Sequence, residues 1–413
     1  MLKSIPPLTR ISLLVSCIVL AGWLFSDGQA RFKIVYLPPV QTPLGTFDSF
    51  FNMDMNDLGQ VVGSTWNLTG AFAGFLYTPG QGVKYIDPSG MFNVRLWRIN
   101  NNGLILGYDG SYSESGRYRI FSYDPQRGYQ WLRKNLPQSE RVRFVDMNDA
   151  GTILAQGRYP WRYSEGPGWQ NLTAISRALK PFKSFTLVGM NRNGDFTLLA
   201  SEKDWNHSYV YFSGSDTLVD LAPIATYGMD INDSGWVVGT AVKWSEPPNV
   251  RPLSARPYLY TPNAGLRRIH PPVKAPLIDA FWITAGGTVG GCVEKNGNCA
   301  SLLTYSKQKE YRTVKEERFR AMLPAGMTFV GVEVAVMNDR NEFVGSVVAD
   351  DPGGEQRNAV WFLWSPRYGL LDLQKVMPAN VKILRVYDLN HRGQILLQVE
   401  GAGKSAAVLT PVI

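Results

Sequence analysis

The stretch Asp230-Ile-Asn-Asp-Ser-Gly-Trp-Val-Val-Gly239 decides the fold, because close copies of it recur along the chain. In it, an Asn-Asp-x-Gly segment stands between two apolar runs. Asn tolerates left-handed backbone, Asp bonds its own main chain and Gly adopts positive φ, so the segment predicts a tight turn between two strands. The first Asn of the turn serves as an anchor in each copy: Asn56, Asn100, Asn148, Asn191, Asn232, Asn338 and Asn390, with Thr284 in a degenerate copy.

The spacing of the copies points to one architecture. Successive anchors are 44, 48, 43, 41, 52, 54 and 52 residues apart. A period in this range with β-type content is typical of propeller blades. Helical solenoids are excluded, since no repeat shows sustained 3.6-residue periodicity.

Each unit supplies four strands, here called a to d; in the first unit, residues 71–78 and 83–87 are strands c and d. The last unit stops after its strand c, and residues 32–37 offer the missing strand, which would leave no open edge. We predict an all-β, eight-bladed β-propeller closed by the N-terminal strand in the last blade. A seven-bladed ring with residues 276–316 as an insertion is the alternative.

The Asn-Asp-x-Gly-x-Val-Val-Gly unit, followed by Ala-Phe-Leu-Tyr-like strands, resembles the bacterial HAF family of extracellular repeat proteins. The resemblance covers essentially residues 31–413 and is closest at 230–239, whereas residues 282–290 depart from it. It implies export and repetition but no established activity.

The composition agrees with a globular β protein. The chain has 413 residues, 45% of them hydrophobic and 18% charged, which excludes a disordered chain. Only residues 11–25 are apolar enough to meet a membrane, so a multi-span membrane protein is excluded as well.

The N-terminal sequence is typical of a secretory signal peptide. Lys3 and Arg10 precede the apolar run, and Gly28 and Ala30 supply the small residues of a cleavage site. We expect a signal peptide over residues 1–30, a single propeller domain over 31–413, and a secreted or periplasmic location. An uncleaved anchor is the alternative.

Two cysteines remain after cleavage, Cys292 and Cys299, on either side of an Asn-Gly hairpin signal. Neighbouring strands and an oxidising compartment predict a disulfide between them, with free thiols as the alternative. Their spacing, without a nearby His or further Cys, makes a poor zinc site.

The net charge of +8 is not gathered into a basic run, so we expect no nucleic acid partner. A mildly basic exported protein is better suited to anionic cell-surface polymers. We expect a monomer with no cofactor. The repeated turns lack the donors of a calcium loop at the required positions, so no metal is expected either.

Candidate ligand residues lie in loops that a propeller gathers on the face opposite the a–b turns. Trp66, Trp205 and Trp244 each follow a strand b, and indole rings stack on sugars. Tyr112 and Arg251 belong to the longest loops of that face. Packing between blades is the alternative role for the three Trp residues.

Two of the three histidines, His207 and His270, fall in loops of the same face and are the only catalytic candidates. We therefore expect a non-catalytic binding module for a glycan or a surface protein. A carbohydrate-active lyase or hydrolase using His207 or His270 is the first alternative, and a structural scaffold in an envelope or secretion assembly is the second.

Overall fold

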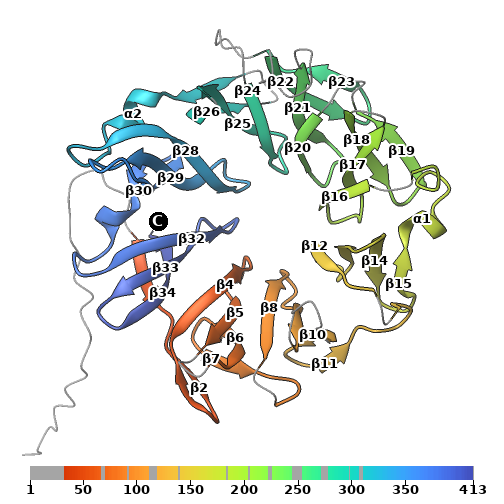
Figure 1. Ribbon diagram of the computed structural model, residues 1–413, viewed down its shortest axis with the longest axis horizontal. Helices are drawn as coiled ribbons and strands as arrows, with labels where there is room; N and C mark the ends of the chain where they lie inside the picture. Colours follow the sequence, from red (N-terminus) through yellow and green to blue (C-terminus); the bar gives the residue numbers. More distant parts are fainter. Residues whose placement is uncertain are drawn as a thin grey trace, which may run out of the picture.

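Eight four-stranded antiparallel sheets form a ring in the computed structural model (Figure 1). The structure describes residues 32–412 except 67–69, 91–92, 111–118, 138–139, 183–184, 203–204, 222–225, 244–253, 271–277, 297 and 307–309. The eight-bladed prediction is confirmed and the seven-bladed alternative is wrong, because residues of the 276–316 block form a complete blade, β24 to β27.

Within a blade the strands follow the chain order a, b, c, d from the centre of the ring outward (Figure 1). Blades 1 to 4 consist of β4 (Ser49–Met55), β5 (Val61–Trp66), β6 (Phe72–Thr78) and β7 (Gly82–Ile86); β8 (Val94–Ile99), β9 (Ile105–Asp109), β10 (Arg119–Asp124) and β11 (Gly128–Trp131); β12 (Arg143–Met147), β13 (Ile153–Gln156), β14 (Pro160–Ser164) and β15 (Gly168–Asn171); and β16 (Phe185–Met190), β17 (Phe196–Glu202), β18 (Trp205–Phe212) and β19 (Thr217–Asp220).

Blades 5 to 8 continue the pattern around the ring. They consist of β20 (Thr226–Ile231), β21 (Val237–Lys243), β22 (Ser254–Thr261) and β23 (Gly265–Arg268); β24 (Ile278–Ile283), β25 (Val289–Lys295), β26 (Asn298–Tyr305) and β27 (Tyr311–Val314); β28 (Thr328–Met337), β29 (Phe343–Asp350), β30 (Gln356–Ser365) and β31 (Gly369–Asp372); and β32 (Lys382–Leu389), β33 (Ile395–Gly401), β34 (Lys404–Pro411) and β1 (Phe32–Tyr36).

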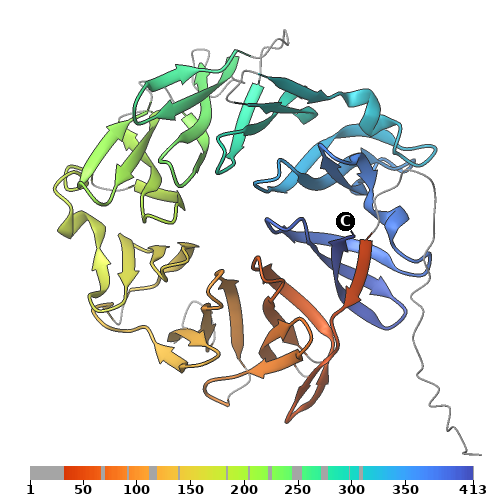
Figure 2. The same ribbon diagram turned by 180° about the vertical axis from the view of Figure 1, so that it is seen from behind.

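The N-terminal strand closes the ring as predicted. β1 pairs antiparallel with β34, with Phe32 opposite Pro411 and Tyr36 opposite Ala407. Figure 2 shows this strand lying along the outer side of the last blade. β34 is thereby paired on both sides, and the last blade has four strands like the others.

Few other elements accompany the blades in the described residues. The hairpin of β2 (Val40–Thr42) and β3 (Gly45–Phe47) contacts β7, the outer strand of blade 1. Three short helical turns follow outer strands: α1 (Leu172–Ile175), α2 (Glu316–Arg320) and the 3-10 turn η1 (Leu373–Val376).

The hydrophobic core lies between neighbouring blades. This explains why strand b has two consecutive valines in several repeats. Val61 packs in the cluster shared with blade 8, whereas the next residue, Val62, packs in the cluster shared with blade 2. Both residues are fully buried. A blade that is covered on both faces needs consecutive apolar residues rather than alternation.

Each innermost strand carries a β-bulge that the sequence analysis did not predict. In β8, for example, the register shifts between Leu96 and Arg98, and the same shift occurs in strand a of all eight blades. A bulge re-aims the side chains beside it. In blades 1, 3, 5 and 8 the residue two positions before the anchor is an Asp whose carboxylate accepts an N–H group of the next blade, as described below.

The membrane and export predictions fall largely outside the described residues. Residues 1–30, the predicted signal peptide, are not among them. No helix within the described ranges is long and apolar enough to cross a bilayer.

The two cysteines lie on the predicted neighbouring strands, β25 and β26; the structure has both as free thiols, and the disulfide stays a prediction. A register shift places Cys292 opposite Leu302 and Cys299 opposite Glu294, so the two residues are offset along the hairpin. A hydrogen bond with Cys299 and burial raise the pKa of the Cys292 thiol well above its usual value.

Candidate functional site

Two cavities lie along the axis of the ring, one on each side of a narrow layer of charged side chains. The larger, about 780 Å³, opens on the side of the d–a and b–c connections, and we call it the loop mouth. The smaller, about 420 Å³, is lined by the a–b turns, and we call it the turn mouth. Asp54 and Arg98 line both.

At the turn mouth the anchor asparagines join each blade to the next. Asn56 Nδ2 donates to the carbonyl of Asn100, 3.0 Å away, and Asn56 Oδ1 accepts the N–H groups of Leu58 and Gln60 in its own turn. The same donation to the next anchor's carbonyl recurs around the ring: Asn100 to Asn148, Asn148 to Asn191, Asn191 to Asn232, Asn232 to Thr284, Asn338 to Asn390 and Asn390 to Asn56. Thr284 has no amide to donate, so the series is interrupted between blades 6 and 7.

The residues after the anchors form a second series of contacts. Asp57 Oδ1 accepts the N–H of His391, 2.8 Å away, and Asp233 Oδ1 accepts the N–H of Arg192. His391 stands where other turns have Asp, and its Nδ1 accepts the N–H of Asp339 at 3.2 Å. An imidazole nitrogen therefore replaces a carboxylate oxygen in the same role.

These contacts confirm the interpretation of the repeated segment as a turn. Gly235 has φ +70°, and Asn341 takes the same left-handed conformation, φ +60°, in the blade 7 turn. Within the described ranges no three His, Cys, Asp or Glu side chains are grouped so that they could hold a metal ion.

A layer of charged side chains separates the two mouths, and we call it the waist. Its members stand two positions before an anchor: Asp54, Arg98, Asp146, Asp230 and Asp388. Each carboxylate accepts an N–H from the next strand a; Asp54 Oδ2 accepts that of Ile99 at 2.8 Å, and Asp230 Oδ2 that of Ile283 at 2.9 Å. Arg98 forms an ion pair with Asp146.

Three waist carboxyls, those of Asp54, Asp230 and Asp388, have raised pKa values. Burial raises the pKa of Asp230 to about 7, although two backbone N–H groups oppose the change. Burial, together with the charge of Asp54, raises the pKa of Asp388 to about 7. Burial also raises the pKa of Asp54, while the nearby Arg98 guanidinium lowers it. Asp146 raises the pKa of Arg98, which keeps the guanidinium charged.

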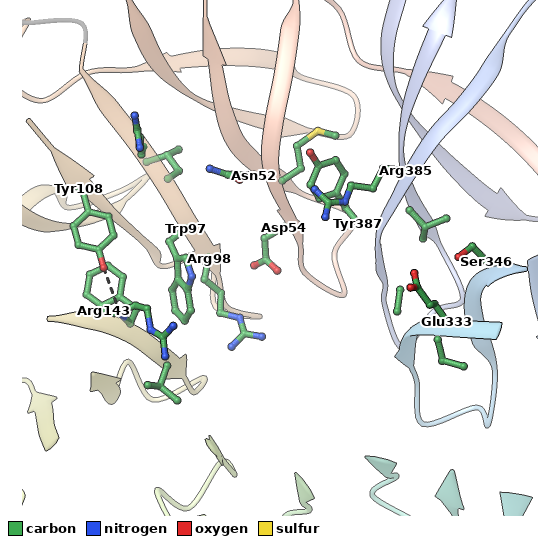
Figure 3. A pocket seen from close by; sticks show the side chains of 18 of the residues that line it. Asn52, Asp54, Trp97, Arg98, Tyr108, Arg143, Glu333, Ser346, Arg385 and Tyr387 are labelled. Atoms are coloured by element: carbon green, nitrogen blue, oxygen red, sulfur yellow. Dashed lines mark hydrogen bonds between the residues drawn. The ribbon is translucent and has the colours of Figure 1, made fainter. Parts of the chain in front are cut away.

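One wall of the loop mouth comes from blades 2 and 3 and is aromatic. Tyr108 stacks on Phe144 with ring centres 4.4 Å apart, and Trp97 packs against Phe144 at 5.3 Å. Arg143, which begins strand a of blade 3, is exposed beside them (Figure 3). Arg95 also lines this wall, with its guanidinium 4.8 Å from the ring of Phe72.

The facing wall comes from blades 7 and 8. Arg385 and Tyr387 project from β32, with the guanidinium 5.5 Å from the tyrosine ring, and Glu333 projects from β28 (Figure 3). Ser346 donates to Asn358 at 3.1 Å on the same side. Asp54, from blade 1, lies between the two walls (Figure 3).

Charged groups of the loop mouth are largely unpaired. Among the described residues, Arg143, Arg385 and Glu333 make no hydrogen bond or ion pair, and Nε of Arg95 is buried without a hydrogen-bond partner. Their guanidiniums and carboxylate therefore keep their donors and acceptors for water or a ligand.

Of the five residues predicted to contact a ligand, Trp66 alone has a described side chain, and it is not among the described residues that line this cavity. Trp66 ends β5 and is 45% exposed, so it is not packed between blades. Trp205 begins β18, but its side chain lies outside the described part of the structure, as do Trp244, Tyr112 and Arg251.

The two histidines lie on different blades. His207 is in β18, where its ring is 6.3 Å from that of Tyr209, and its Nδ1 is buried without a described partner. His270 follows β23 and is exposed; its carbonyl accepts the hydroxyl of Tyr311. Neither lines either mouth, and their catalytic role stays a prediction.

Comparisons with known proteins find distant structural neighbours and no family. No family model and no curated protein matches the chain. Similar solved structures include a streptogramin B lyase, at 11% identity and TM-score 0.38 over 94% of this chain and 100% of that one. The β-propeller domain of the Trilobed protease from Pyrococcus furiosus matches at 10% identity and TM-score 0.45, over 79% and 98%. The tricorn protease matches at 12% and 0.45, over 86% and 36%.

Sequence reasoning missed the loop mouth because its residues lie in the innermost strands, which were read only as apolar segments. The signal was present: Arg95, Arg143, Glu333 and Arg385 stand five residues before their anchors, where a purely structural strand would need no charge. Charged residues at equivalent inner positions of several blades are the pattern to look for.

Proposed function

We propose that this protein is a binding module that holds a glycan in the loop mouth. The observation that carries the proposal is the 780 Å³ cavity, whose walls combine Trp97 and Tyr387 with unpaired charged groups. Its volume is in the usual range of small-ligand sites, which are lined by aromatic surface and a few polar groups. Indole and phenol rings offer flat apolar faces with a polar end, which suits the faces of sugar rings.

The test compares two tryptophans of the same blade. Trp97→Ala removes an aromatic face from the cavity, whereas Trp131→Ala removes one on the outer strand β11. The chain is applied to a glycan array, and hits are measured by calorimetry with both variants. We expect Trp97→Ala to weaken binding at least tenfold and Trp131→Ala to leave it unchanged. Equal effects of the two substitutions would contradict the proposal.

The same samples test the catalytic alternative. Products are checked for new reducing or unsaturated ends after incubation with each bound glycan. Turnover that is lost in His207→Ala or His270→Ala would favour the lyase or hydrolase, and binding without turnover favours the module. A pull-down of envelope proteins addresses the scaffold alternative.

We further propose that residues 1–30 direct export and that the repeats belong with the HAF family. In an oxidising compartment we expect Cys292 and Cys299 to join, because the two thiols already share a hydrogen bond. Mass spectrometry of the exported chain, with and without reductant, measures both the cleavage site and the loss of two hydrogens.

A further inference from the structure

We infer that the loop mouth takes an oligosaccharide that carries carboxylate groups at intervals, as in a chain of acidic sugars. The inference rests on the proposed function and names the class of glycan. It starts from the charge of the cavity and from the placement of that charge on two walls.

Among the described residues that line the loop mouth, the charge that is not engaged elsewhere is positive. Arg95, Arg143 and Arg385 contribute three positive charges, and Glu333 contributes one negative charge, which leaves two. Arg98 and Asp54 also line the cavity, but they are engaged with the waist. A neutral glycan would leave these guanidiniums without counter-charges, whereas an acidic ligand would satisfy them.

The arginines suit carboxylates in particular. A guanidinium presents parallel N–H groups that match the two oxygens of a planar carboxylate. Arg143 and Arg385 project from opposite walls of the cavity (Figure 3), so one small anion contacts only one of them. A ligand that reaches both needs two acidic groups separated by neutral structure, and acidic sugars linked in a chain have that form.

Glu333 argues against a densely charged ligand. It shares the wall of Arg385, is exposed and makes no described ion pair (Figure 3). A carboxylate repels closely spaced sulfates or phosphates but accepts hydrogen bonds from sugar hydroxyls. The aromatic faces of Trp97 and Tyr387 supply surface for the sugar rings between the acidic groups.

The experiment uses galacturonate oligomers and their methyl esters, in which each carboxylate is replaced by a neutral methyl carboxylate on the same sugar chain. Calorimetry on the full chain is expected to show at least tenfold tighter binding of the acid than of the ester. Arg143→Gln is expected to weaken binding of the acid about tenfold, because a hydrogen bond to a charged group is lost, and to leave the ester unaffected. Arg267→Gln, on the outer strand β23, is the matched control and is expected to change neither.

A second variant probes Glu333, with sulfated dextran as the densely charged probe. Glu333→Gln is expected to tighten binding of sulfated dextran about threefold or more, because like-charge repulsion is removed. Equal affinity for acid and ester would overturn the inference while leaving the proposed glycan module intact. Tighter binding of sulfated dextran than of galacturonate by the unmodified chain would also overturn it. Absence of binding to any glycan would overturn both, and circular dichroism of each variant separates loss of folding from loss of binding.

Discussion

The turn mouth is lined by all eight blades and the loop mouth by five of them, and the two differ in how their polar groups are used. At the turn mouth, seven of the eight anchors are asparagines, buried to 8% exposure or less, whose side chains bond to neighbouring main chain. Five residues earlier, the equivalent positions differ from blade to blade: Phe51, Arg95, Arg143, Thr186, Tyr227, Asp279, Glu333 and Arg385. Of these, Arg95, Arg143, Glu333 and Arg385 line the loop mouth. Repetition in which the anchor side chains are hydrogen-bonded indicates structure, and divergence that leaves charged groups without described partners indicates a ligand site.

The largest expected effect is the loss of an anchor. Asn191→Ala removes the donor to the Asn232 carbonyl and the acceptor of two N–H groups in its own turn. Because these groups would remain buried without partners, we expect a loss of about 3 kcal/mol or more in unfolding free energy. Thr186→Ala, at the exposed opposite end of the same strand, is the control and should cost less than about 0.5 kcal/mol. Urea unfolding measures the change in unfolding free energy for both variants. Similar changes would contradict the structural role given to the turn mouth.

The next effect comes from the waist and depends on pH. The pKa of Asp230 is about 7 in the folded protein, above the usual value for an unfolded aspartate, so the folded state holds its proton more tightly. This contribution to stability is fully present below about pH 4 and is lost as pH rises through about 7. Between pH 5 and pH 8, we expect the unfolding free energy of Asp230→Asn to decrease by about 2 kcal/mol less than that of the unmodified chain. An unchanged slope would show that Asp230 is ionised throughout.

A smaller effect of opposite sign is expected where the anchor series is interrupted. Thr284→Asn supplies the missing amide, within reach of the Asn338 carbonyl if it follows the other blades. It also supplies an Oδ1 for the turn N–H groups, of which Thr284 accepts only that of Thr288. We expect a gain of about 1 kcal/mol, the net worth of one added hydrogen bond. Thr284→Val, which lacks any acceptor, should lose stability under the same conditions, and a loss in both variants would refute the equivalence of the eight turns.

The smallest effects on stability are expected at the loop mouth. Arg143→Gln and Glu333→Gln remove charges that have no described partner, so each should change the unfolding free energy by less than about 0.5 kcal/mol. The same two variants are expected to change ligand affinity. A large loss of stability in either variant would show that the charged group stabilises the fold. The loop mouth would then have the same structural role as the turn mouth.

Much of the fold could be predicted because propeller repeats record it locally. The Asn-Asp-x-Gly turns specify a hairpin within ten residues, and the unpaired last blade required the strand at residues 32–37. The role of the anchors between blades could not be read in the same way. The carbonyl that Asn56 reaches lies 44 residues away, and only the closed ring brings it close.

The bulge and the site needed the structure for a related reason. A bulge changes the alternation of buried and exposed residues in a strand, so that buried residues stand three apart, as Phe144 and Met147 do. In the sequence of one repeat, this spacing does not distinguish a bulge from an irregular strand. The loop mouth combines side chains from five blades, so no local pattern describes it. The predicted Trp residues of the b–c loops stay a prediction, whereas Trp97, which lines the cavity, belongs to an inner strand and was not singled out.

The pairing of β1 with β34 has a mechanical consequence. Phe32 and Pro411 are opposite each other, so the two flanking ends of the chain leave the sheet at the same point. A force that pulls them apart loads the Phe32 to Pro411 end first and opens the pairs one after another, like a zip, instead of shearing five residues together. Tension applied through these two ends of the chain is therefore expected to act first on the strand pair that closes the ring.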